Sequence, residues 1–71
     1  MKLNLKNKFG ERLKKIRTNE SITQEELAEA LDVTREFIGL VESGVYGTSF
    51  DKLERLSEHF NKPVKYFFDF D

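Results

Sequence analysis

The chain has 71 residues, of which 38% are hydrophobic and 35% are charged, a composition typical of a folded domain. It contains no cysteine and one histidine, so neither disulfides nor a cysteine- or histidine-rich metal site can stabilise it. A chain of this size buries only about 60% of the surface that it exposes when unfolded. We therefore expect a single domain over residues 1–71, reinforced by a second copy of itself.

The net charge of −1 is unevenly distributed. Residues 1–17 carry seven Lys or Arg and one Glu, a net +6, whereas residues 18–71 carry five Lys or Arg and twelve Asp or Glu, a net −7. The basic start, with residues 1–7 as an arm, is either a phosphate-binding segment or a solvated helix face. It lacks the apolar stretch of a secretion signal, and no segment has the ~20 apolar residues of a membrane span, so we expect a cytoplasmic protein.

The first predicted helix covers about residues 8–19, where apolar residues recur at the spacing of one helical face. These residues are Phe9, Leu13 and Ile16. The second helix begins after Thr23, which can cap it while Glu26 reaches back to form a capping box. Ile22 and Leu27 occupy the positions of a hydrophobic staple around the same cap.

A third helix follows almost at once, with Thr34 as its predicted N-cap and Gly44 at its end. Because the second helix ends near Asp32, the connection is only about three residues long, and the two helices must cross steeply. Ala28 is the small residue expected where their backbones approach. This arrangement is that of a helix-turn-helix unit.

Two further helices complete the pattern. The fourth is expected to start at Thr48 or Ser49 and to stop at Asn61, which tolerates the left-handed conformation. One apolar face runs along it, formed by Phe50, Leu53, Leu56 and Phe60. Pro63 suits the first position of a short fifth helix, whose apolar residues are Val64, Phe67 and Phe68. The predicted fold class is therefore all-α with five helices.

The segments FGERLKKIR, TQEELAEALDVTREFIGLVESG and TSFDKLERLSEHFNKPVKYFF together resemble the lambda repressor-like, Cro/C1-type (XRE-like) helix-turn-helix family over about residues 8–68. They are similar to short stand-alone regulators, such as restriction–modification controller proteins and phage or mobile-element repressors. The resemblance implies a homodimer that binds double-stranded DNA, with a recognition helix from each copy in the major groove of a near-palindromic site.

The resemblance also implies roles for individual residues. Four residues of the third helix match positions that face the bases: Arg35, Glu36, Gly39 and Leu40. A second group matches positions that contact phosphate or orient the helix on DNA: Thr23, Gln24, Phe37, Ser43, Tyr46 and Lys52. Arg17 and Glu42 match an arginine and a glutamate that pair in related proteins and hold the recognition helix at its angle.

The chemistry of the third helix fits base reading. Arg35 can donate two hydrogen bonds to guanine O6 and N7, and Glu36 can accept one from cytosine N4 or orient Arg35. Leu40 and Phe37 can contact thymine methyl groups, and Gly39 allows a close approach to the DNA. The alternatives are ordinary first-turn charges for Arg35 and Glu36, packing at the core edge for Phe37, and a protein contact for Leu40.

The C-terminal aromatic residues are candidates for the dimer interface: Tyr66, Phe67 and Phe70. Phe67 and Phe68 are also expected to enter the core. Three departures from the family concern single positions, because Ser21 and Asp32 stand where glycine is common and Lys62 stands where an aliphatic residue is common. A fourth concerns the loop Ser43–Thr48, which contains no Lys or Arg. Since phosphate neutralisation provides most non-specific affinity and the pI is about 5.8, we expect modest affinity for DNA.

An enzyme is not expected, because His59 has no evident base partner and the carboxylates are scattered over helix faces. The four glycines fit no phosphate-binding loop. No cofactor, metal or small-molecule ligand is predicted. The sequence leaves one other class open, a protein-interaction module such as an antirepressor or antitoxin-like partner that kept the fold and lost DNA binding. The acidic remainder of the chain, the uncharged loop and the outward-facing Phe37 and Leu40 are the features that would support it.

Overall fold

The computed structural model of the chain describes residues 4–70. It contains four α-helices and one short 3-10 helix: α1 (Leu5–Asn19), α2 (Gln24–Leu31), α3 (Arg35–Glu42), α4 (Phe50–Phe60) and η1 (Val64–Phe68). No strand occurs in this part of the chain, so the all-α prediction is confirmed. None of these helices has the length and hydrophobicity needed to span a lipid bilayer.

The predicted count of five α-helices is not met, because the last element is a 3-10 helix of five residues. Its backbone N–H at Tyr66 donates to the carbonyl of Pro63, three residues earlier, over 3.0 Å. The 3-10 geometry is used mostly in such short segments, because its hydrogen bonds are poorer than those of an α-helix.

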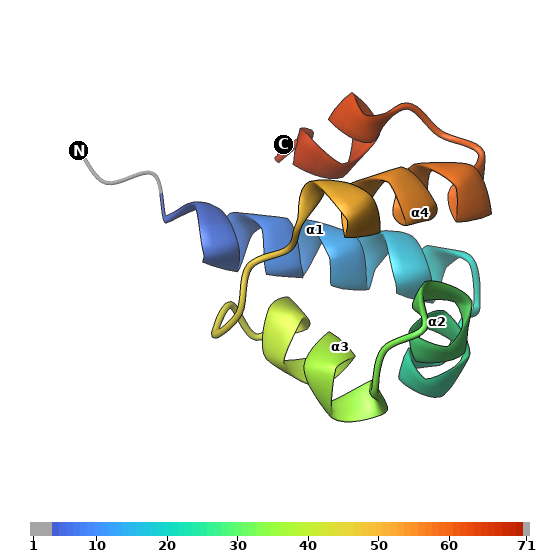
Figure 1. Ribbon diagram of the computed structural model, residues 1–71. Coiled ribbons are helices and arrows are strands. Elements are labelled where there is room, and N and C mark those ends of the chain that lie inside the picture. The colour runs from blue at the N-terminus through green and yellow to red at the C-terminus, as the bar shows by residue number, and fades with distance from the viewer. Residues whose placement is uncertain (1–3, 71) are drawn as a thin grey trace.

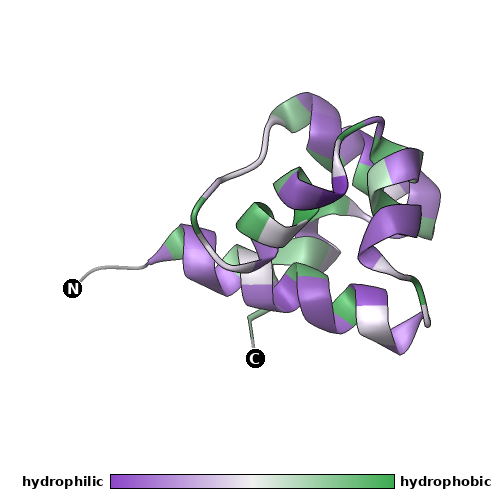
Figure 2. Cartoon of the chain, turned by 90° about the horizontal axis from the view of Figure 1, so that it is seen from below, coloured by the Kyte–Doolittle hydropathy of each residue, from purple (hydrophilic) through white to green (hydrophobic). Residues whose placement is uncertain are grey.

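The helices are arranged around α1, which crosses the middle of the molecule with α4 and η1 on one side and α2 and α3 on the other (Figure 1). Hydrophilic and hydrophobic residues alternate along every helix (Figure 2), as expected where each helix buries only one side. The buried apolar residues come from all five elements: Phe9, Leu13, Ile16, Leu27, Ala28, Leu31, Ile38, Val41, Leu53, Leu56 and Phe67. The predicted apolar stripe of the first helix is therefore confirmed.

One predicted core position is wrong. Phe50 was expected on the apolar face of the fourth helix, but 86% of its surface is exposed. It is the first residue of α4, whereas the residues that α4 buries, Leu53 and Leu56, lie further along the helix.

The α-helices end in turns of one kind, each with a residue at positive φ. These residues are Ser21 (59°), Asp32 (57°), Gly44 (85°) and Asn61 (54°). In each turn the next backbone N–H donates to a carbonyl five residues earlier, at 2.9–3.1 Å, which is the Schellman pattern. Glycine adopts this conformation without strain, whereas the other three residues adopt it at a cost.

The first helix begins at Leu5, about three residues earlier than predicted. Residues 5–7 of the expected basic arm are therefore helical, and residues 1–3 lie outside the described part of the chain. Asn7 packs against Gly44, where an added Cβ atom would lie 1.7 Å from the Asn7 Oδ1. The first turn of α1 is thus held by the loop after α3, a tertiary contact without a signal in the local sequence.

Gly10 marks the closest approach of α1 to α3. A Cβ atom added to Gly10 would lie 2.3 Å from the carbonyl oxygen of Val41 and 2.6 Å from that of Glu42. Both atoms belong to backbone, so neither can swing aside. Only a residue without a side chain allows α1 and the last turn of α3 to meet at this distance.

We expect Gly10→Ala to lower the free energy of unfolding by about 2 kcal/mol or more, because the added methyl group overlaps backbone atoms. Gly39→Ala is the matched control, since Gly39 is also inside a helix but an added Cβ there meets only the Gln24 Nε2, at 3.9 Å. The control substitution should raise stability by about 0.5–1 kcal/mol through helix propensity. Urea denaturation followed by circular dichroism measures both, and similar changes in the two variants would contradict this packing.

Candidate functional site

The turn between α2 and α3 consists of Asp32, Val33 and Thr34. Asp32 reverses the chain at positive φ, and the Val33 N–H donates to the Ala28 carbonyl over 2.9 Å. Thr34 then caps α3, because its hydroxyl accepts from the N–H of Phe37 over 3.1 Å. Ala28, only 4% exposed, lies in the core beside this turn. The result is two eight-residue helices held at a fixed angle, with α3 on the outside of the molecule (Figure 1).

The start of α2 carries the predicted capping box. The Thr23 hydroxyl accepts from the Glu26 N–H over 3.0 Å, and the Glu26 carboxylate accepts from the Thr23 N–H over 2.8 Å. The backbone hydrogen bond from Thr23, and secondarily its side-chain hydrogen bond, lower the pKa of Glu26 below its ordinary value. This box fixes the first turn of α2 and leaves the N–H groups of Gln24 and Glu25 directed outward.

A buried ion pair links α1 to the end of α3. Arg17 Nε lies 2.6 Å from one Glu42 oxygen and Arg17 Nη2 lies 3.0 Å from the other, so the contact is bidentate. The remaining Arg17 nitrogen, Nη1, donates to the carbonyl of Ile22 over 2.8 Å. The structure therefore places this pair as the family resemblance implied.

Gln24 joins the same network, because its Nε2 donates to the Glu42 Oε1 over 3.0 Å. Its amide also lies beside Gly39, on the outer side of α3. The network fixes the start of α2 and the end of α3 on α1. No described buried side-chain nitrogen or oxygen lacks a hydrogen-bond partner, as stability requires for charges removed from water.

The outward side of α3 carries the predicted base-facing residues. Arg35 and Glu36 are exposed, and Gly39 and Leu40 are half-buried. The hydrogen bonds and ion pairs formed among residues 4–70 do not include the side chains of Arg35 and Glu36. Of the two roles considered for Glu36, the one that orients Arg35 is not seen in this structure, and both side chains are exposed in the first turn of α3.

Phe37, Tyr46 and Lys52 form a cluster at one edge of α3. The Phe37 and Tyr46 ring centroids lie 5.8 Å apart, and the Lys52 Nζ lies 5.2 Å from the Phe37 centroid. The loop reaches this position because the N–H groups of Val45 and Tyr46 both donate to the Leu40 carbonyl. That carbonyl also accepts from the Ser43 hydroxyl over 3.1 Å. The structure thus gathers three residues predicted from distant positions in the sequence.

The C-terminal aromatic residues lie on another part of the molecule. Phe67 has no exposed surface, so its assignment to a dimer interface is wrong, whereas its assignment to the core is confirmed. Tyr66 is half-buried beneath the Arg12 guanidinium, 4.5 Å from the ring centroid, and Arg12 Nε donates to the Tyr66 carbonyl over 2.9 Å. Phe70 packs on Phe68 with centroids 6.0 Å apart.

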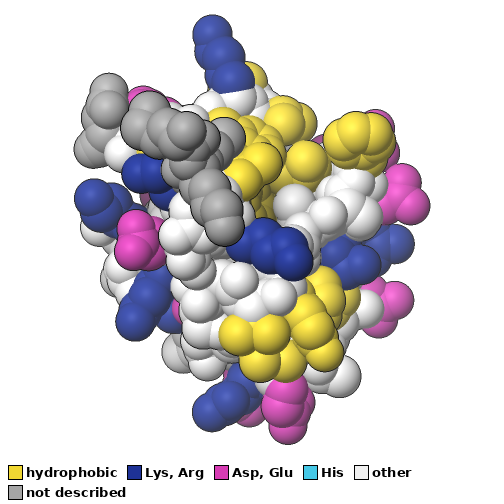
Figure 3. All heavy atoms as spheres, turned by 90° about the vertical axis from the view of Figure 1, so that its left-hand side faces the viewer, with side chains coloured by type: hydrophobic (Ala, Val, Ile, Leu, Met, Phe, Trp, Pro, Cys, Tyr) yellow, Lys and Arg dark blue, Asp and Glu magenta, His cyan; other side chains and the backbone are white. Residues whose placement is uncertain are grey.

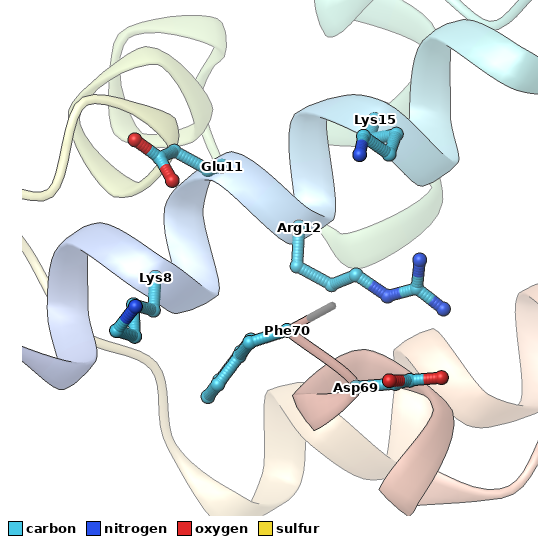
Figure 4. A pocket seen from close by; sticks show the side chains of 6 residues that line it. All are labelled: Lys8, Glu11, Arg12, Lys15, Asp69 and Phe70. Carbon is cyan, nitrogen blue, oxygen red and sulfur yellow. The ribbon is translucent and has the colours of Figure 1, made fainter.

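A shallow pocket separates this C-terminal segment from α1 (Figure 4). Its lining mixes both charges with one aromatic ring: Lys8, Glu11, Arg12, Lys15, Asp69 and Phe70. Within residues 4–70 no three His, Cys, Asp or Glu side chains gather as a metal site would require. The mixed charge of this pocket fits a solvated seam between α1 and the chain end.

Sequence reasoning missed two arginines that hold elements together. Arg12 fixes η1 on α1, and Arg55 Nη1 donates to the Leu31 carbonyl at the end of α2 over 3.0 Å. Lysines surround Arg12 in the sequence, but only arginine combines a planar face for the Tyr66 ring with a directed hydrogen bond. An arginine within a Lys-rich helix was therefore the one sequence feature that could have indicated this contact of Arg12.

Two eight-residue helices joined by a three-residue turn, with the second helix on the surface, define a helix-turn-helix domain. Comparison with known proteins assigns its family, since the model described as Helix-turn-helix matches residues 13–67. The chain belongs to this XRE-like helix-turn-helix family of DNA-binding transcriptional regulators.

Individual relatives agree with this assignment. The chain is 37% identical over 60 residues to a protein of Archaeoglobus fulgidus named as an uncharacterized HTH-type transcriptional regulator, covering 84% of each chain. Its structure is similar to that of the restriction–modification controller protein C.AhdI from Aeromonas hydrophila, with a TM-score of 0.79, 30% identity, and 86% and 92% of the two chains covered. It is also similar to the clp gene regulator ClgR from Corynebacterium glutamicum, with a TM-score of 0.84, 25% identity, and 90% and 68% covered.

We expect Arg17→Ala to lower the free energy of unfolding by about 3–5 kcal/mol, because it leaves the buried Glu42 carboxylate without its charged partner. Lys15→Ala, an exposed change on the same helix, serves as the control and should alter stability by less than about 0.5 kcal/mol. A double variant, Arg17→Met with Glu42→Leu, should regain much of the loss, since no isolated charge remains buried. Equal stabilities of Arg17→Ala and Lys15→Ala in urea would contradict the role of the pair.

Proposed function

We propose that the protein is a sequence-specific transcriptional regulator that acts as a homodimer on a near-palindromic DNA site. The outward side of α3 is the observation that carries this proposal. It combines two free charged side chains, a glycine and a half-buried leucine on a helix whose other side is locked to the core. Two such helices related by a two-fold axis would enter successive major grooves about 34 Å apart.

Base reading is assigned to the first two turns of α3. Arg35 at the N-terminal turn is free to donate to guanine O6 and N7, and Glu36 beside it is free to accept from cytosine N4. Leu40 offers an apolar contact for a thymine methyl group one turn later. Gly39 lies between them, and its lack of a side chain brings the helix axis closer to the base edges.

Phosphate contacts are assigned to the two borders of α3. On one side, the outward N–H groups at the start of α2 suit a phosphate oxygen, with Thr23 and Gln24 at that end. On the other side, Lys52 supplies the charge, and the hydroxyl groups of Ser43 and Tyr46 supply polar contacts. Stacking of Lys52 on the Phe37 ring would hold its ammonium group in place, which makes up in part for a loop without Lys or Arg.

The few cations near α3 set the expected strength of binding. Arg35 and Glu36 are both exposed in the first turn of α3, and the exposed Glu25 adds another carboxylate at the start of α2. Electrostatic affinity grows with the number of phosphates neutralised, and Lys52 is the cation assigned to a phosphate in each subunit. We infer modest non-specific affinity, with discrimination that depends mostly on base contacts.

We expect Arg35→Ala to reduce the preference for the bound site over unrelated DNA by about 1–3 kcal/mol per half-site, because a bidentate guanine contact is lost. The site is first obtained by selection from a random DNA library, which also gives the half-site spacing. Fluorescence anisotropy at physiological salt then measures both variants, with Lys65→Ala on η1 as a control that removes one exposed charge elsewhere. Similar weak binding to every sequence, unchanged by Arg35→Ala, would contradict the proposal and favour the protein-interaction module.

We expect Lys52→Ala to weaken binding to all DNA sequences alike and to reduce the slope of log Kobs against log salt concentration by roughly 0.9 per contact. Two symmetric contacts give a change of about 2 for the dimer. Lys62→Ala is a matched control, because the Lys62 Nζ lies 5.2 Å from the Tyr66 centroid, the same distance as Lys52 from Phe37. A slope that changes equally in both variants, or in neither, would exclude Lys52 from the phosphate contact.

A further inference from the structure

An apolar groove lies where the first turns of α1 and α4 meet. It has a volume of about 390 Å³ and is lined mostly by hydrophobic side chains: Leu5, Phe9, Phe50, Leu53 and Phe68, with Lys6, Gly47 and Thr48 at its edges. Figure 3 looks onto this end of the molecule and shows hydrophobic side chains gathered around a hollow. The groove is separate from the outward side of α3, since neither Arg35 nor Leu40 lines it.

Phe50 is the most exposed of the aromatic residues that line this groove, with 86% of its surface exposed. Leu5, which also lines the groove, is 45% exposed. A contiguous apolar patch on so small a domain marks a contact surface. The ring protrudes from the same face that the groove indents. A projection and a matching hollow on one face are the requirement for contact between identical copies related by a two-fold axis.

We propose that a second copy of this chain covers the groove, with Phe50 of each copy inserted into the groove of the other. The inference deepens the proposed function, because it gives the proposed homodimer its interface. It replaces the interface expected at the C-terminal aromatic residues. Phe67 is fully buried within the monomer, Arg12 and Lys62 lie over the Tyr66 ring, and Phe70 packs on Phe68.

The charges around the groove support a second copy as its occupant. Lys6 lies at one edge, with its side-chain carbons within 4.0 Å of where a Cβ of Gly47 would be. Asp51 follows Phe50 in the first turn of α4 and is exposed. When Phe50 of one copy enters the groove of the other, Asp51 moves with it toward Lys6 of that copy. Two-fold symmetry forms this opposite-charge contact twice.

The size of the contact predicts a reversible dimer. A buried aromatic side chain removes about 150–250 Å² from water, and two rings with the groove edges amount to the low end of specific interfaces, below about 1,200 Å² in total. Interfaces of that size belong to transient complexes. We therefore expect monomer and dimer to exchange at micromolar concentrations, with the dimer favoured when both copies hold adjacent half-sites.

Sedimentation velocity of the full chain without DNA, from 1 to 200 µM, tests the interface. The wild-type chain should form dimers within this range, and Phe50→Glu should raise the dimer dissociation constant at least a hundredfold. Because Phe50 is almost fully exposed, this change should leave the circular dichroism spectrum and the melting temperature nearly unaltered. Val64→Glu on η1, which changes another exposed apolar residue (38% exposed), should leave dimerisation unchanged.

Charge exchange gives a second readout that an effect within one subunit cannot produce. Lys6→Glu alone and Asp51→Lys alone each place like charges across both symmetric contacts, so each should dimerise about tenfold more weakly. Mixing the two variants restores opposite charges at both contacts, and native mass spectrometry should detect heterodimers in excess of either homodimer.

A wild-type chain that stays monomeric at 200 µM, or dimers unaffected by Phe50→Glu, would overturn this interface. A mixture without preference for heterodimers would overturn the proposed arrangement of Lys6 and Asp51. These outcomes are separable from the failure of DNA binding, because Arg35→Ala should dimerise like wild type while losing its preferred site. Loss of site preference by the wild-type chain with an intact Phe50-dependent dimer would instead count against the proposed function alone.

Discussion

The contact between α1 and the last turn of α3 is the constraint on which the rest of the structure depends. Gly10 lets the backbones of α1 and α3 meet. The ion pair between Arg17, further along α1, and Glu42, at the end of α3, fixes the two helices in that position. Burying two charges contributes little net stability, but a buried pair accepts few alternative geometries. The orientation of α3, and hence of every residue on its outer side, follows from this contact. The surface that would read DNA is therefore positioned by contacts that lie within the core.

Local sequence signals predicted most of the helix boundaries, because caps act within one turn of the chain. Thr23, Thr34 and Ser49 accept the hydrogen bonds expected of N-caps, and Gly44 and Asn61 end their helices at positive φ. The start of α1 was beyond this kind of reasoning, since it rests on tertiary packing of the first turn against the loop after α3.

The sequence predicted which residues form the candidate site better than it predicted the contacts among them. Family resemblance named the residues on the outer side of α3, but Gln24 turned out to donate to Glu42, which a sequence pattern cannot indicate. For the aromatic residues, the sequence did not distinguish the side chains that are buried from those that are exposed. Phe50 and Phe67 look alike in the sequence, yet one is almost fully exposed and the other fully buried. Periodicity assigns a helical face, whereas burial depends on whether another element lies over that turn.

The shortness of α2 and α3 has a consequence for how such a protein can be switched off. Each contains eight residues, and isolated helices shorter than about 12–15 residues are marginal in water. The outward side of α3 therefore keeps its helical shape only within the intact domain, and a peptide with the sequence of α2 and α3 alone would be a disordered coil. One proteolytic nick in the exposed stretch between α3 and α4 would leave α1 and α2 on the same fragment as α3, but it would detach Leu53, Leu56 and Phe67 from the core that all five elements share. Inactivation by cleavage would then be complete rather than graded.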